Sequence, residues 1–198
     1  MFDTEALLQY GGLLLVLLTI YGQTGLFFCF FLPSGAFLFL AAVWIANGQL
    51  DHSLWTLCSL GILASVLGCI TGYLIGYNAG PLLYRSESRF FRKQHLTAAK
   101  DFYDRYGALA LIIGVFLPLT RTFGPIVAGI IRVRFGRLLL HTFLGSVGWI
   151  VSFAISGYLI GSMPFLRPYL NYVVIAIIAC VTAPMVVKMV RHLRGKTA

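Results

Sequence analysis

The sequence predicts an all-α membrane protein: an inverted repeat with two re-entrant, proline-containing helical hairpins plus transmembrane helices. The first observation is composition. The 198 residues are 59% hydrophobic and 11% charged, whereas a soluble domain is about 25% charged. The second is a set of apolar segments interrupted twice by proline, and the third is a match of the chain to itself at an offset of 85 residues. The composition excludes a soluble globule and a disordered chain, so residues 1–198 are treated as a single membrane domain.

Six apolar segments divide the chain, and a helix needs about 20 residues to span a bilayer. Two of them are interrupted, one by Pro33 and the other by Pro118 and Pro125 on either side of Arg121. Proline removes a backbone donor and clashes with the preceding turn, so these two segments are predicted to be hairpins. A glycine at every fourth residue from 68 to 80 indicates close helix packing. The segments are 6–22, 24–46, 54–84, 108–131, 138–161 and 169–190.

The basic residues predict the topology. All fifteen Lys and Arg residues lie from Arg85 onward, mostly in patches at 85–105, 132–137 and 188–196. The positive-inside rule puts all three patches in the cytoplasm only if 108–131 dips in and returns. The C-terminus is then cytoplasmic, after a last transmembrane helix at 169–190. Segment 85–105 is either an amphipathic connector on the membrane surface or a solvated one. Because the patches end apolar runs, nucleic acid is excluded as a partner.

The self-match defines two halves, at roughly 20–84 and 105–165. The loop after segment 24–46 is predicted outside, so the first hairpin enters from outside and the second from inside. Such an inverted repeat is a transporter architecture whose substrate site lies at the broken helices. The matching pairs are Tyr21-Gly22 with Tyr106-Gly107, Phe31-Leu32-Pro33 with Phe116-Leu117-Pro118, and the GYLIG runs at 72–76 and 157–161.

Arg121 is the strongest candidate for a functional residue. A central arginine costs roughly 2.5–3.5 kcal/mol on insertion scales, and its fork of donors suits phosphate. The alternative is an arginine that snorkels to the interface or bonds carbonyls of the first hairpin. The predicted substrate-binding set comprises Arg121, Thr120, Thr122, Pro118, Gly124 and Pro125 in the second hairpin, and Gln23, Pro33, Ser34 and Gly35 in the first.

The sequence contains no motif for a proton relay, an enzyme active site or a metal site. All six acids lie at termini or in loops, so no carboxylate relay is predicted inside the membrane. There is no HExxH, P-loop or zinc-type Cys/His spacing, so we expect no enzyme activity, no metal and no cofactor. His141 is interpreted as an interfacial or packing residue, and the four cysteines as small buried hydrophobes.

Four stretches resemble the DedA family of bacterial membrane proteins, whose shared region is the VTT or SNARE-associated domain. They are GQTGLFFCFFLPSGAFLFLAA (22–42), GYLIGYNAG (72–80), FLPLTRTFGPIVAG (116–129) and the run from Gly145 through Trp149 to Gly161. The resemblance implies a flippase or scramblase for undecaprenyl phosphate or a phospholipid in the bacterial cytoplasmic (inner) membrane.

The chain departs from the family pattern at three positions. The family commonly has an acid at the position of Gln23, another near Gly35, and an arginine at the position of Val115. Because removing one partner of a buried charge pair is costly, their joint loss is coherent and argues against proton coupling. We therefore expect translocation of an anionic, phosphate-bearing lipid, with membrane lipids as partners and a homo-oligomer left open. The alternatives are a porter for a small ion or solute and a non-transporting membrane scaffold.

Overall fold

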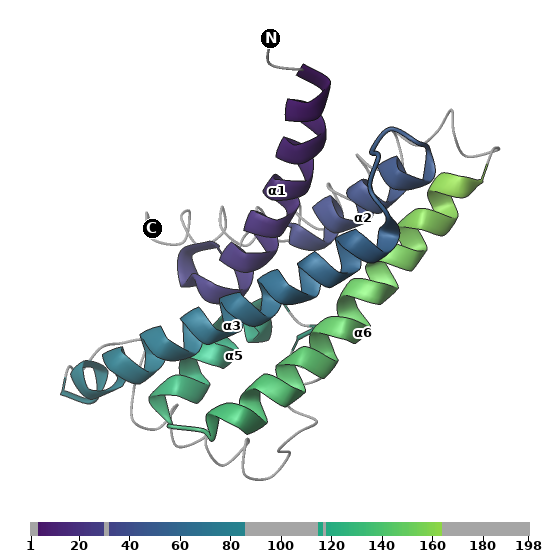
Figure 1. Cartoon of the computed structure of the whole chain (residues 1–198). Coiled ribbons are helices and arrows are strands. Elements are labelled where there is room, and N and C mark those ends of the chain that lie inside the picture. The colour runs from purple at the N-terminus through teal and green to yellow at the C-terminus, as the bar shows by residue number, and fades with distance from the viewer. Residues whose placement is uncertain (1–3, 30–31, 86–114, 117, 164–198) are drawn as a thin grey trace, which may run out of the picture.

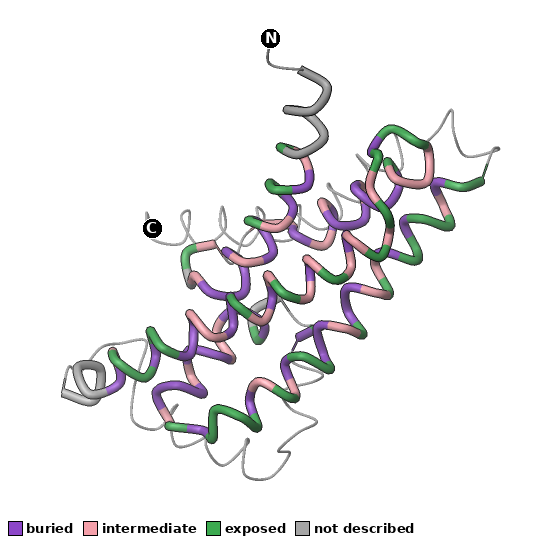
Figure 2. Tube along the Cα trace, viewed as in Figure 1, coloured by how far each residue is buried: buried purple, intermediate pink, exposed green. Residues whose placement is uncertain are grey.

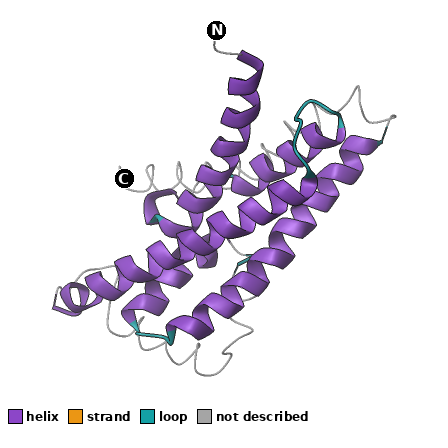
Figure 3. Ribbon diagram, viewed as in Figure 1, coloured by secondary structure: helices purple, strands orange, loops and turns teal. Residues whose placement is uncertain are grey.

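The computed structural model describes residues 4–29, 32–85, 115–116 and 118–163. Within these ranges the chain is helical and contains no strand (Figure 3). The rest of the predicted connector after Arg85, the first arm of the second hairpin and the predicted helix 169–190 lie outside the described residues. The elements are α1 (Thr4–Gly25), η1 (Phe27–Cys29), α2 (Ser34–Ala46), α3 (Leu54–Arg85), α5 (Pro118–Ile130) and α6 (Phe135–Ser162).

Two long helices, α3 and α6, pack against each other and run in opposite directions (Figure 1). Their apolar stretches, Leu54–Gly80 and Phe135–Ser162, are 27 and 28 residues long, which is enough to cross a bilayer. Both match the predicted segments closely. In the described part of the chain these are the two helices with the length and composition of membrane spans.

Two short helices lie beside the long ones, each against the long helix of the other predicted half. Helix α2 packs on α6 and α5 packs on α3 (Figure 1). Each has 13 residues, or about 20 Å of helix, which is too short to span the hydrocarbon core. Helix α2 begins just after Pro33, and α5 begins at Pro118, so both begin at prolines that interrupt the predicted apolar segments. The re-entrant path and the inverted topology stay predictions.

The first hairpin differs from the sequence prediction in its first arm. Helix α1 continues to Gly25, and only η1 and a short link separate it from α2. The arm before Pro33 is therefore the end of α1 and not a separate helix within 24–46. Glycine at 25 lets α1 continue in close contact with α3, because a Cβ there would lie 2.8 Å from the Gly68 carbonyl oxygen.

Each GYLIG run makes a close contact between a long helix and a short one. A Cβ on Gly76 of α3 would overlap the Ile126 carbonyl of α5, and a Cβ on Gly161 of α6 would lie 2.9 Å from the Ala46 Cβ of α2. Small residues allow such backbone approach in membrane helices. Each run thus receives the short helix of the other half.

The core lies where α1, α2, α3 and α6 meet (Figure 2). Ile20, Leu38 and Ile150 are fully buried there. Large apolar side chains also cover the outside, with Leu14 of α1 56% exposed and Leu140 of α6 57% exposed. An apolar exterior around an apolar core suits a helix bundle surrounded by lipid tails.

The α3–α5 contact makes Gly76 a sensitive position. We expect Gly76→Ala to lower the free energy of unfolding by about 1–3 kcal/mol, because overpacking forces the backbones apart. Gly136→Ala is the matched control, since a Cβ at Gly136 meets nothing within 4 Å. Thermal unfolding of both purified variants in detergent measures the difference. Equal melting temperatures would show that α3 and α5 do not cross at this point.

Candidate functional site

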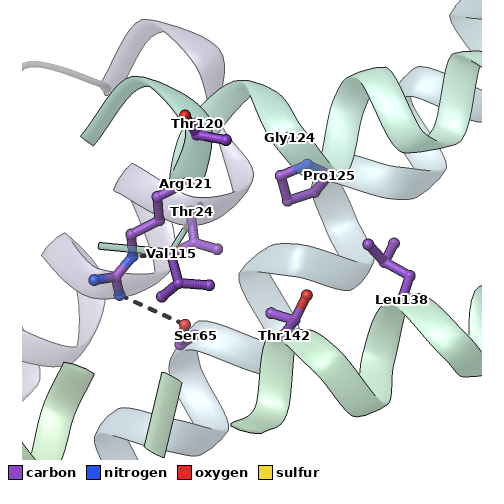
Figure 4. A pocket seen from close by; sticks show the side chains of 9 residues that line it. All are labelled: Thr24, Ser65, Val115, Thr120, Arg121, Gly124, Pro125, Leu138 and Thr142. Atoms are coloured by element: carbon purple, nitrogen blue, oxygen red, sulfur yellow. Dashed lines mark hydrogen bonds between the residues drawn. The ribbon is translucent and has the colours of Figure 1, made fainter. Parts of the chain in front are cut away.

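Arg121 lies in the first turn of α5 and is buried, with only 3% of its surface exposed. Its Nε donates to Thr24 Oγ1 at 3.2 Å and its Nη2 to Ser65 Oγ at 3.5 Å (Figure 4). Its third nitrogen, Nη1, is buried without a hydrogen-bond partner among the described residues. The side chain neither snorkels to the surface nor donates to a carbonyl of the first hairpin in this part of the structure. It is held by hydroxyl groups of α1 and α3.

Trp149 of α6 covers the guanidinium with its ring. The Arg121 Cζ atom lies 3.8 Å from the ring centroid, a distance at which the negative face of the indole attracts a cation. Trp149 also packs against Phe153, with 4.7 Å between ring centroids. A Cβ on Gly35 would lie 3.1 Å from each of these two side chains. Trp149 therefore joins the beginning of α2 to Arg121 of α5.

A line of small polar groups between α3 and α6 continues from the arginine. The Ser65 and Ser146 hydroxyl oxygens are 2.8 Å apart, and the Cys69 thiol donates to Thr142 Oγ1 at 3.4 Å. Thr24 donates its own proton to the Ile20 carbonyl of α1 at 2.9 Å. Buried polar groups are costly unless they are paired, so these bonds stabilise a polar layer within the apolar bundle.

A small cavity of about 20 Å³ borders the arginine (Figure 4). That volume admits about one water-sized particle. Polar groups come from α1, α3, α5 and α6, and the remaining surface is apolar. The lining residues are Thr24, Ser65, Val115, Thr120, Arg121, Gly124, Pro125, Leu138 and Thr142.

Gln23 and Ser34 form a separate polar contact between the end of α1 and the beginning of α2. Gln23 Nε2 donates to the Leu32 carbonyl at 2.8 Å, and the Ser34 hydroxyl donates to Gln23 Oε1. Ser34 is fully buried and Gln23 is 6% exposed. An ionised carboxylate at position 23 would have no proton for the Leu32 carbonyl, whereas the amide present here both donates and accepts. We call the contact of Gln23 with Leu32 and Ser34 the α1–α2 lock.

The structure divides the predicted site residues. Arg121, Thr120, Gly124 and Pro125 line the cavity, whereas Thr122 is fully buried beside it and is not part of its lining. Gln23 and Ser34 form the α1–α2 lock next to the half-buried Pro33, and Gly35 reaches the site through Trp149. Pro118 begins α5, and its side chain lies outside the described residues.

Sequence reasoning missed the groups that hold the arginine. These are Thr24, Ser65 and Trp149, with Ser146 and Thr142 behind them. Some signal was present. Ser65 and Cys69 stand four apart on α3, as do Thr142 and Ser146 on α6. This spacing puts each pair on one helix face, but only the fold shows that the two faces meet.

Comparison with known proteins decides the family. The VTT domain matches residues 31–159. The chain belongs to the DedA family. It is 28% identical to protein DedA of Escherichia coli, over 96% of this chain and 89% of that protein. It is 32% identical to an uncharacterised membrane protein of Mycobacterium tuberculosis (91% and 80%), and 30% to the inner membrane protein YghB of E. coli (83% and 77%). No solved structure matches the chain.

As a member of the DedA family, the chain is a membrane protein. Val115 is a position at which it differs from the pattern expected of that family. The resemblance leads one to expect an arginine at this position, and here a buried valine lines the cavity beside Arg121. A second guanidinium would double the positive charge in the same small space. In this member of the DedA family the buried cation stands beside an apolar side chain.

The α1–α2 lock can be tested through Gln23. We expect Gln23→Leu to lower the free energy of unfolding by about 1–3 kcal/mol, because the buried Ser34 hydroxyl loses its acceptor and the Leu32 carbonyl keeps only its bond from the Ser34 backbone N–H. Gln49→Leu, at an exposed position of the loop after α2, is the control. Both are measured by thermal unfolding in detergent. A Gln23→Leu protein as stable as its control would show that the lock contributes nothing.

Proposed function

We propose that this DedA-family protein moves an anionic, phosphate-bearing lipid between the leaflets of the bacterial cytoplasmic membrane. The observation that carries the proposal is the buried guanidinium of Arg121 with hydrogen-bonding capacity left at Nη1. Arginine binds phosphate oxygens in a forked, charge-assisted geometry. The substrate class is undecaprenyl phosphate or a phospholipid, and the protein acts as a transporter and not as an enzyme.

The mechanism uses the two helix pairs. In our proposal α5 and α2 are the inner arms of re-entrant hairpins, in halves related by inverted topology. This is supported by the packing of each short helix on the long helix of the other half: α5 lies on the α3 glycines and α2 lies on the α6 glycines. Rocking of one pair against the other would present Arg121 to each leaflet in turn. The acyl chains stay in the bilayer throughout.

The size of the cavity sets a condition on this cycle. About 20 Å³ admits one water-sized particle and not a phosphate group. The described arrangement is therefore the closed form in our proposal, and α5 must separate from α3 and α6 for lipid to bind. Where the structure describes side chains, the single acid is Asp51, in the exposed loop between α2 and α3. For this reason we propose that lipid movement is uncoupled and scramblase-like. The basic patches place the C-terminus in the cytoplasm in this proposal.

The same cavity favours a second candidate, passage of a small anion. A monatomic ion fits the space that a phosphate group does not. In that case soluble ions would pass through a pathway shielded from the bilayer, and no groove open to lipid would be needed. Anion flux and lipid exchange are measured in the same vesicles to separate the two functions.

Arg121 is the residue on which lipid movement depends. We expect Arg121→Ala to reduce leaflet exchange by about 10–100-fold, because a charge-assisted hydrogen bond contributes roughly 1.5–3 kcal/mol. Exchange of a fluorescent phospholipid and of a labelled polyprenyl phosphate is followed in proteoliposomes, with and without a pH gradient. Arg137→Gln, which changes an exposed cation of α6, is the control.

Each result of this experiment has a defined meaning. Exchange that needs Arg121 and ignores the gradient supports an uncoupled lipid translocator. Exchange that stops without the gradient contradicts the absence of proton coupling. If no lipid moves while chloride does, the second candidate replaces the first. If neither moves in the folded protein, transport is rejected and a scaffold role takes its place.

A further inference from the structure

The cavity beside Arg121 has an excess of hydrogen-bond donors. A guanidinium has five N–H groups and no acceptor. Two of its nitrogens donate to Thr24 and Ser65, while Nη1 has no partner among the described residues. Two hydroxyl-bearing positions beside the arginine can donate as well, although a hydroxyl oxygen also keeps acceptor lone pairs. Thr142 accepts from the Cys69 thiol, so its own proton remains to be donated. The Ser65–Ser146 bond uses only one of the two protons that this pair carries.

The cavity is also short of negative charge. The ring of Trp149 attracts the cation, but it carries no formal charge. Where side chains are described, the only carboxylate is that of Asp51, far along the chain in an exposed loop. A buried charge without a counterion costs several kcal/mol. A particle that accepts hydrogen bonds and carries negative charge would relieve both the donor excess and the missing charge.

We propose that this cavity is a binding site for one small monovalent anion, a halide of the size of chloride. Ser65 and Thr142 both line the cavity, and Figure 4 shows Arg121 donating to Ser65. A volume of about 20 Å³ is close to that of a chloride-sized ion and is smaller than that of a phosphate group. A halide only accepts hydrogen bonds. A water molecule accepts hydrogen bonds as well, but it brings no negative charge to balance the guanidinium.

The site gives the resting protein a counterion for Arg121. A lipid phosphate that binds the same guanidinium must displace the halide, so chloride should compete with lipid. This consequence rests on the proposed lipid transport, whereas the halide site itself does not. The two are therefore tested by separate measurements.

Halide binding is measured on the purified full-length protein in detergent. Sodium chloride and sodium bromide are compared with sodium gluconate at equal ionic strength, which keeps screening constant. We expect the melting temperature to rise by about 3 °C or more at a halide concentration ten times the Kd. The chloride NMR resonance should broaden in the presence of protein and narrow again when bromide is added.

Three variants locate the bound ion. Thr142→Val and Ser65→Ala each remove a hydroxyl donor but leave the charge of Arg121, and each should weaken halide binding several-fold. Arg121→Met should abolish it. Ser156→Ala is the matched control, because its exposed hydroxyl donates to the Phe153 carbonyl on the same helix. This variant should bind halide as the wild type does.

The outcomes separate the two proposals. Equal melting temperatures and line widths in chloride and gluconate for the wild type would overturn the halide site, whether or not any variant folds. So would halide binding that survives in Arg121→Met. Lipid exchange about tenfold slower in chloride than in gluconate, at ten times the Kd, supports direct competition. Halide binding without any lipid exchange would reject the lipid transport and leave the halide site standing.

Discussion

The buried guanidinium of Arg121 is the interaction on which the centre of this bundle depends. A cation removed from water inside an apolar bundle needs compensation from several directions at once. Here α1 supplies the Thr24 hydroxyl, α3 supplies Ser65 and α6 supplies the face of Trp149. Moving any one of these helices would uncover part of the charge. The arginine therefore constrains the relative positions of four helices, because its own helix α5 is the fourth.

Short polar side chains can reach the arginine only because the helices lie unusually close. Thr24 precedes Gly25, where a Cβ would lie 2.8 Å from the Gly68 carbonyl oxygen, and Ser65 stands one turn before Gly68. The glycine contact thus brings the two hydroxyl-bearing segments together. Membrane helices gain little from burying apolar surface against each other. Close backbone packing and a few hydrogen bonds must provide the cohesion in its place.

How much of this could be predicted depends on whether a feature is local. Helix positions follow from apolar length and proline, so α3, α6 and the beginnings of α2 and α5 agree with expectation. Arg121 could be recognised because a charge in an apolar segment is costly by itself. Trp149 and Ser65 could not, because their importance arises from contacts between segments far apart in the chain. The end of α1 was misjudged because the first apolar segment was taken to end at residue 22, whereas the helix continues to Gly25 in contact with Gly68 of α3.

The packing of each short helix on the long helix of the other half has a consequence for biosynthesis. The surface that α2 presents to α6 includes Phe39 and Ala42, which meet Gly157. Helix α2 leaves the ribosome long before Phe135 begins α6, so this surface must wait for its partner during insertion. Contacts between distant segments slow folding, and chains that wait with exposed surfaces are prone to misassembly. The protein therefore acquires its native packing only after most of it has been synthesised.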